Sequence, residues 1–152
     1  MTAACPLCEV VARCERGEFP LRIVLLDHSA VILGDNQGCP GWCVAVLRRH
    51  VEHLDELPVD EQAGVFAEVA AVARAIRAEF PRSGANGSPP RINYECLGNV
   101  VAHIHWHVIP RHAVDPTPRA PVWGWSPEQL RGPMPDVERA ALAQRLVQRL
   151  RK

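Results

Sequence analysis

The chain has 152 residues, of which 47% are apolar, and 17 basic residues balance 17 acidic ones. This length fits one globular domain, and a net charge of zero gives no support to a nucleic-acid or membrane-surface role, which needs an excess of Lys and Arg. No apolar run approaches the roughly 20 residues of a transmembrane helix, and residues 1–8 lack the features of a signal peptide. We therefore expect a cytoplasmic protein whose six cysteines are buried, reactive or metal-bound rather than disulfide-bonded.

The N-terminal segment contains the pair Cys5 and Cys8, separated by two residues. This spacing lets two thiolates hold one tetrahedral zinc ion. Alone it is half a metal site, and two incidental thiols in an N-terminal turn are the other interpretation until further ligands are found. Residues 10–19, which carry mixed charge, indicate a short helix.

Three short apolar stretches follow. Residues 21–26 and 30–33 are rich in Val and Ile and predict two strands of a hairpin or meander. Residues 34–41 have the composition of a loop. Residues 42–47 predict a third strand, which we expect to be buried because it is apolar on both faces.

Two histidines come directly after the third predicted strand, at positions 50 and 53. A single histidine at a strand end is usually structural or solvated. Because the pair Cys5 and Cys8 needs two further ligands, one of these two histidines is a candidate zinc ligand. We favour His50 because it lies closer to the strand.

Residues 61–80 predict the longest helix. Their apolar side chains recur at intervals of three and four residues, which places them on one face that packs on the core. Asp60 is the expected N-cap, and Pro81 is expected to end the helix. The predicted core face consists of Val65, Phe66, Val69, Val72, Ala73, Ile76 and Phe80.

A fourth strand is predicted at residues 91–96, after a loop at 83–90, and residues 97–99 predict a tight turn. Asn93 and Asn99 flank this turn. Each amide could satisfy the backbone of the turn, or it could point toward a ligand.

Residues 101–111 contain His103, His105 and His107, with apolar residues between them. Successive side chains of a strand point to opposite faces, so this alternation predicts three imidazoles in one row on a fifth strand. Residues two apart do not share a face of a helix. Pro110 has no N–H to donate, and we expect it to end the strand.

The segment after the histidines, residues 112–125, is rich in Pro and Trp and predicts an arm that lies over the site or over a partner subunit. A last amphipathic helix follows, for which Asp136 is the expected N-cap. Its predicted apolar side consists of Val137, Ala141, Leu142, Leu146 and Leu150.

Three interpretations of the histidine row remain open. The row could bind a metal, although adjacent rings of a straight row diverge and rarely share one ion. A neutral imidazole could attack phosphorus while its neighbours donate hydrogen bonds to the phosphate. The histidines could also be structural, but three of them are a costly way to build a core, because each brings polar atoms that need partners.

The stretch 103–109 is similar to the His-x-His-x-His-x-x signature of the histidine triad superfamily, a group of nucleotide hydrolases and transferases. The similarity runs from Cys5 to about Trp125 and resembles a bacterial branch described as diadenosine-tetraphosphate-hydrolase-like. It implies an α+β, HIT-like fold: an antiparallel sheet of about five strands with one long helix packed on it and a C-terminal helix. It further implies a homodimer, a HIT domain at residues 1–125, and a helical extension of that domain at 126–152.

The resemblance also assigns roles. His105 is implied as the nucleophile toward the α-phosphate, His107 as a contact to the phosphate and the leaving group, and His103 as the residue that orients the row. Asn99 stands where the family commonly has a phosphate-binding Gln, and Asn93 is expected to reach the same phosphates. The implied activity is cleavage of a phosphoanhydride or phosphoramidate of a nucleotide through a nucleotidyl-histidine intermediate. The alternatives are a zinc-stabilised nucleotide-binding or sensor protein with little turnover, and a metal-dependent hydrolase that uses the triad as ligands.

In relatives that carry the cysteine pair, zinc is bound by both cysteines, a histidine after the third strand and the first triad histidine. In this chain those are Cys5, Cys8, His50 and His103. Four protein ligands leave no position for water, so the implied zinc is structural. The chain departs from the family where Trp42 replaces a further histidine, which we expect to change the support of the nucleophile's other nitrogen. Asn99 is also shorter than Gln.

Overall fold

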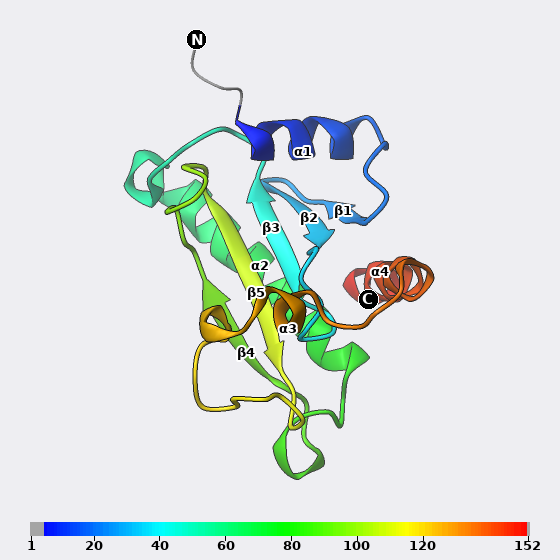
Figure 1. Ribbon diagram of the computed structural model, residues 1–152. Coiled ribbons are helices and arrows are strands. Elements are labelled where there is room, and N and C mark those ends of the chain that lie inside the picture. Colours follow the sequence, from blue (N-terminus) through cyan, green and yellow to red (C-terminus); the bar gives the residue numbers. More distant parts are fainter. Residues whose placement is uncertain (1–4, 152) are drawn as a thin grey trace.

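Five strands form one antiparallel sheet in the order β1-β2-β3-β5-β4 (Figure 1). The computed structural model describes residues 5–151. Every strand predicted from the sequence is present, with ends that differ by one or two residues, and the α+β class is confirmed. The strands are β1 (Arg22–Leu25), β2 (Ser29–Leu33), β3 (Cys43–Leu47), β4 (Arg91–Glu95) and β5 (His105–Arg111).

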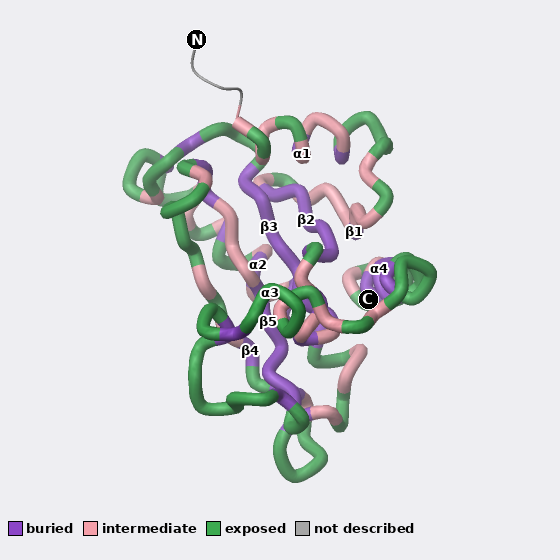
Figure 2. The backbone as a smooth tube through the Cα atoms, viewed as in Figure 1, coloured by how far each residue is buried: buried purple, intermediate pink, exposed green. Residues whose placement is uncertain are grey.

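Strands β2 and β3 are buried along their whole length, which was predicted for β3 because it is apolar on both faces (Figure 2). β3 pairs with the histidine-bearing strand β5, so that Val44 lies opposite His107 and Val46 lies opposite His105. On its other side, β5 pairs with β4, where Glu95 lies opposite His107. This register fixes which side chains surround the histidines.

Helices cover both faces of the sheet. The long helix α2 (Val59–Glu79) and the C-terminal helix α4 (Asp136–Leu150) pack together over one face, where they bury a core with Val31, Ala45 and Val108. The opposite face carries a second apolar cluster beneath α1 (Pro6–Glu15) and the arm that follows β5. The remaining elements are the short helix α3 (Pro127–Arg131) and the 3-10 turns Leu54–Glu56, Ala85–Gly87 and Val122–Gly124.

The predicted starts of three helices are wrong. α1 begins before residue 10, because Pro6 has the backbone geometry that suits the first turn of a helix. α2 is preceded by Pro58, and α4 by Pro135, so Asp60 and Asp136 lie inside the first turn instead of capping it. There their negative charges face the positive end of the helix dipole, which explains their place in the sequence. Pro81 does follow the end of α2, as expected.

Two predicted core faces also need correction. Phe66 on α2 is 47% exposed and leans on the ring of Trp106, with 5.2 Å between ring centroids. On α4 Val137 is 78% exposed, whereas Leu142 and Leu146 are buried as predicted. Ala141 is also exposed, and the buried positions include Arg139, which donates to three backbone carbonyls. The spacing gave the period of each helix but not the limits of the face that meets the sheet.

Pro110 does not end the histidine strand, contrary to the prediction. β5 continues to Arg111, and Pro110 lies opposite Ile92 of β4. The pairing of β5 with β3 stops at Val108, so β5 is paired on one side only at Pro110. A residue without an N–H is tolerated at such an edge.

Between residues 5 and 151, no helix combines the length and the apolar character that a membrane crossing requires.

Candidate functional site

The three histidines do not form one row. His105 and His107 lie on β5 and point to the face that carries α1 and the arm, with ring centroids 5.1 Å apart. His103 comes two residues before the strand begins, and its side chain is buried. The alternation therefore predicted the face of His105 and His107 correctly but not the separate place of His103.

His105 is held by a backbone oxygen. Its Nδ1 lies 2.6 Å from the carbonyl oxygen of His103. A carbonyl can only accept, so Nδ1 carries the proton and donates, and in the neutral ring Nε2 keeps a free lone pair. The ring is only partly buried, which leaves this nitrogen available to an electrophile.

His107 is held in the opposite tautomer. The indole Nε1–H of Trp42 donates to Nδ1 of His107 at 3.1 Å, so the proton of the neutral ring is on Nε2. Burial, together with the nearby His105, lowers the pKa of His107 to about 4. At neutral pH His107 is therefore an uncharged hydrogen-bond donor. Trp42 therefore supports His107, whereas Nδ1 of His105 is supported by the backbone carbonyl of His103.

These assignments predict opposite tautomers for neighbouring histidines. In long-range ¹H–¹⁵N spectra, His105 should show the Nδ1–H form and His107 the Nε2–H form, with His107 neutral until the pH falls to about 4. Because the unfolded ring takes up its proton near pH 6.5, this depressed pKa lowers the free energy of unfolding as the pH falls from about 6.5 toward 4.

The substitution Trp42→Phe removes the indole donor and should let both tautomers of His107 appear. Trp125→Phe is the matched control, because that indole donates to Thr117 instead. A His107 that titrates near pH 6.5, or that carries its proton on Nδ1 in the unsubstituted protein, contradicts the assignment.

The buried ring of His103 belongs to a second cluster. Its Nε2–H donates to the carbonyl of Leu47 at 2.7 Å, which leaves Nδ1 as a lone-pair nitrogen. Burial lowers the pKa of His103, so the ring stays neutral, as a metal ligand must. Around this Nδ1 lie Cys5, Cys8 and His50, and the four ligand atoms are all within 4.8 Å of one another.

The spacing of these atoms fits zinc. The Sγ atoms of Cys5 and Cys8 lie 3.4 and 3.6 Å from Nδ1 of His103, and Nδ1 of His50 lies 3.3 Å from the same atom. A tetrahedral ion with Zn–S bonds of about 2.3 Å and Zn–N bonds of about 2.0 Å separates S from N by about 3.5 Å and N from N by about 3.3 Å. These three separations agree with this geometry to about 0.2 Å or better.

The structure also distinguishes between the two histidines after β3. His50 reaches the cluster, with Nδ1 3.3 Å from Sγ of Cys8. His53 is exposed and lies at the start of the turn Leu54–Glu56, where its backbone N–H donates to Glu56. The choice of His50 from the sequence matches this arrangement.

The two asparagines are placed differently. Asn93 lies on β4 on the same face as His107, and its amide donates to Glu95 at 3.4 Å. Asn99 is exposed in the segment between β4 and β5. Within residues 5–151, neither asparagine side chain forms a hydrogen bond with His103, His105 or His107.

Two residues at the site were missed. Trp123 of the arm lies edge-on against His107 and Trp42, with ring centroids 5.2 and 5.5 Å apart, and its indole N–H donates to the carboxylate of Glu95. Glu95 is the cross-strand neighbour of His107. Only the aromatic composition of the arm hinted at Trp123, and nothing in the spacing pointed to Glu95. The arm therefore lies over the site.

Comparison with known proteins agrees with this geometry. A family model described as HIT domain matches residues 16–114. "Protein hit" of Bacillus subtilis is 32% identical over 109 residues, 71% of each chain, and an uncharacterised HIT-like protein of Methanocaldococcus jannaschii is 28% identical over 73% of this chain and 81% of its own length. The crystal structure of a histidine triad (HIT) protein from Sinorhizobium meliloti has a TM-score of 0.71 at 29% identity, covering 88% of this chain and 93% of that one.

A Zn-bound histidine triad family protein from Mycobacterium smegmatis shares the fold, with a TM-score of 0.63 at 24% identity over 97% of this chain and 96% of that one. The family model spans well over half of the sequence, and it includes both strands that frame the histidines. This chain therefore belongs to the histidine triad (HIT) family.

Proposed function

We propose that the protein is a nucleotide hydrolase or nucleotidyl transferase that works through a nucleotidyl-histidine intermediate on His105. HIT proteins bind nucleotides. The sequence resembles the diadenosine-tetraphosphate-hydrolase-like branch, so dinucleoside polyphosphates are among the proposed substrates. The observation that carries it is the hydrogen bond from Nδ1 of His105 to the carbonyl of His103, which leaves Nε2 as the reactive nitrogen.

In the proposed first step, the Nε2 lone pair of His105 attacks the α-phosphorus of the nucleotide. A P–N bond forms, and the bond from phosphorus to the leaving group breaks, with its electron pair departing on the leaving group. In the second step a water oxygen attacks the same phosphorus, the P–N bond breaks, and its electron pair returns to Nε2. The water releases one proton, and the product is a nucleoside monophosphate; another acceptor in place of water makes the reaction a transfer.

His107 is proposed to donate its Nε2–H to a phosphate oxygen or to the leaving group. Its pKa of about 4 means that the free site has no spare proton there at neutral pH. Leaving groups that depart as stable anions, such as the phosphate end of a phosphoanhydride, therefore suit the site better than amines, which need a proton. Asn99 and Asn93 are proposed as further phosphate contacts, and Asn93 has to exchange its bond to Glu95 for one to the substrate.

The cluster of Cys5, Cys8, His50 and His103 is proposed to hold a structural zinc ion, as the ligand spacing supports. When bound, the ion supplies a fixed tetrahedral anchor, with no open position for substrate. His103 then links the two sites: its ring faces the cluster, while its own carbonyl accepts the hydrogen bond from His105. A fixed His103 fixes the orientation of the proposed nucleophile.

The test is a substrate panel of dinucleoside polyphosphates, nucleoside phosphoramidates and nucleotide sugars, combined with rapid quenching at alkaline pH. We expect turnover of at least one class and a nucleotidyl adduct on His105, located by peptide mass spectrometry. Tight nucleotide binding without turnover would instead favour the sensor interpretation. An adduct on another residue would refute the assignment of His105.

We further propose a homodimer. Phe66 (47% exposed) leans on Trp106 on the α2 side of the sheet, and Tyr94 (52% exposed) lies opposite Val108 on the same face. Among the described residues the buried indole Nε1 of Trp106 has no acceptor. A partner that covers this patch would bury apolar surface and could supply the acceptor.

Phe66→Asp places a charge in this patch and should raise the dimer dissociation constant by about tenfold or more, as measured by analytical ultracentrifugation. Val137→Asp is the matched control, because it makes the same change at an exposed apolar residue of α4. Equal sedimentation of both variants and the unsubstituted protein would place the interface elsewhere.

A further inference from the structure

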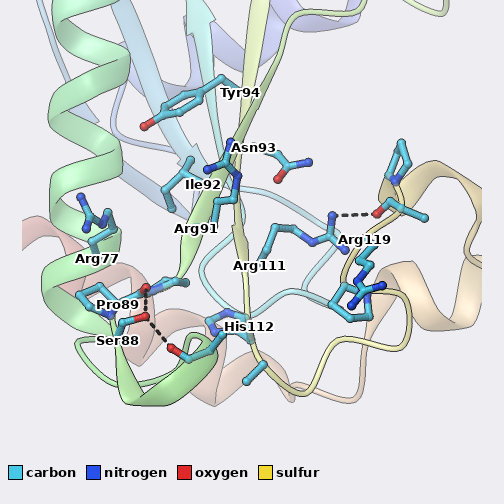
Figure 3. A pocket seen from close by; sticks show the side chains of 16 residues that line it. Arg77, Ser88, Pro89, Arg91, Ile92, Asn93, Tyr94, Arg111, His112 and Arg119 are labelled. Atoms are coloured by element: carbon cyan, nitrogen blue, oxygen red, sulfur yellow. Dashed lines mark hydrogen bonds between the residues drawn. The ribbon is translucent and has the colours of Figure 1, made fainter.

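A large cavity in the described part of the chain lies at the start of β4, and the histidines of β5 are not part of its lining. It has a volume of about 1060 Å³, at the upper end of the roughly 300–1,000 Å³ of small-molecule sites. Figure 3 shows Arg77 on α2 at one side and Arg111 with Arg119 at the other, with Arg91 and Asn93 between them.

The lining of this cavity is positively charged. It contains four arginines and no Asp or Glu, in a chain whose 17 basic and 17 acidic residues balance. Arg111 is neutralised by Asp115 at 2.8 Å, but none of the ion pairs formed among residues 5–151 includes Arg77, Arg91 or Arg119. Three guanidinium groups therefore face one cavity without a protein counter-charge.

The fold holds two of these cations in place. Arg91 lies directly opposite Arg111 in the register of β4 and β5, which places the two side chains on the same face of the sheet. Arg111 also donates to the carbonyls of Thr117 and Ala120, at 2.9 Å each, and so anchors the loop that carries Arg119. Arg119 is thereby kept at the edge of the same cavity.

We propose that this cavity binds an oligophosphate chain, with Arg91 and Arg119 as the principal ligands and Arg77 as a further one. Guanidinium groups match phosphate oxygens in charge and geometry, and several of them around one space favour a ligand with several adjacent phosphates over a single carboxylate. Neither His105 nor His107 is part of the lining of this cavity; Asn93 at its rim bonds to Glu95, which also accepts from Trp123 beside His107. The inference does not depend on the proposed reaction.

Inorganic tripolyphosphate is the probe, with binding measured by isothermal titration calorimetry at fixed ionic strength. The variant Arg91→Gln/Arg119→Gln should weaken binding by about tenfold or more, since each charge-assisted hydrogen bond contributes substantially to affinity. Arg74→Gln is the control for a loss of charge alone: it removes one positive charge from the exposed surface of α2, outside the cavity lining. Unchanged affinity in the double variant, or an equal loss in Arg74→Gln, would overturn the proposal.

His105→Asn provides a second check. Binding of tripolyphosphate should persist in this variant, and its loss there would assign the ligand to the histidines and overturn the proposal. Tripolyphosphate binding through Arg91 and Arg119 in a protein without turnover supports this inference and refutes the proposed function. Turnover combined with unchanged tripolyphosphate binding in the arginine variants supports the proposed function and refutes the oligophosphate site.

The source of the phosphates follows from kinetics. If the cavity holds the far end of the substrate, the double variant should raise KM for a dinucleoside tetraphosphate but not for a nucleoside phosphoramidate. If the ligand is a separate oligophosphate, neither KM should change. Both kinetic results support an oligophosphate site if calorimetry also shows that the double variant binds tripolyphosphate more weakly.

Discussion

Replacing His105 with asparagine is expected to reduce turnover by on the order of a thousandfold or more, because no other side chain at the site offers a free imidazole nitrogen in the same position. His107 cannot take over: its Nδ1 accepts from Trp42, and its Nε2 carries the proton. Nucleotide affinity and zinc content should change little. Initial rates on the best substrate of the panel, together with the absence of the adduct, measure the effect.

His53→Asn is the control for this substitution. It makes the same chemical change at an exposed histidine outside the site, and asparagine is also accepted at the start of a helical turn. Its rate should equal that of the unsubstituted protein. If His105→Asn retained more than a few per cent of the rate while the protein stayed folded, covalent catalysis at this position would be excluded.

Removal of the metal is expected to cost stability first and activity only as a consequence. Cys8→Ser, or a strong chelator, should lower the free energy of unfolding by several kcal/mol and Tm by on the order of 10 °C, because a structural ion is bound by the folded chain only. The physical link is the cluster itself, which joins α1, the segment after β3 and the segment before β5. Calorimetric melting and elemental analysis, with one zinc per chain expected, measure it.

Cys96→Ser is the matched control, since Cys96 is exposed and lies outside the cluster. It should leave both Tm and metal content unchanged. Loss of turnover on chelation with no change in Tm would instead support a metal-dependent hydrolase. Equal Tm values for Cys8→Ser and Cys96→Ser would show that the cysteine pair holds no structural ion.

Local patterns predicted the strands well. Apolar runs located the first three strands. The alternation of His105, Trp106 and His107 located the fifth and gave the correct faces of β5, because a strand alternates side chains whatever it packs against. The helix caps at Asp60 and Asp136 were wrong because an acidic residue is favourable both as a cap and in the first turn. Phe66 was misplaced because helical spacing gives a period and not the width of the buried face.

The sequence by itself determined the charge balance, the absence of a long apolar run and the order of the elements. It also carried the resemblance that pointed to His105 and to four zinc ligands. The tertiary structure alone decided that His103 precedes β5 instead of sharing a row with His105 and His107, and that Trp42 holds His107 in the opposite tautomer from His105. It also brought Trp123 and Glu95 together over the site. It also gathered around one cavity three arginines that form no ion pair with any residue from 5 to 151. The physical reason is that a ring's tautomer and a cluster's charge depend on partners from distant segments, whereas alternation and apolar content depend on near neighbours in the chain.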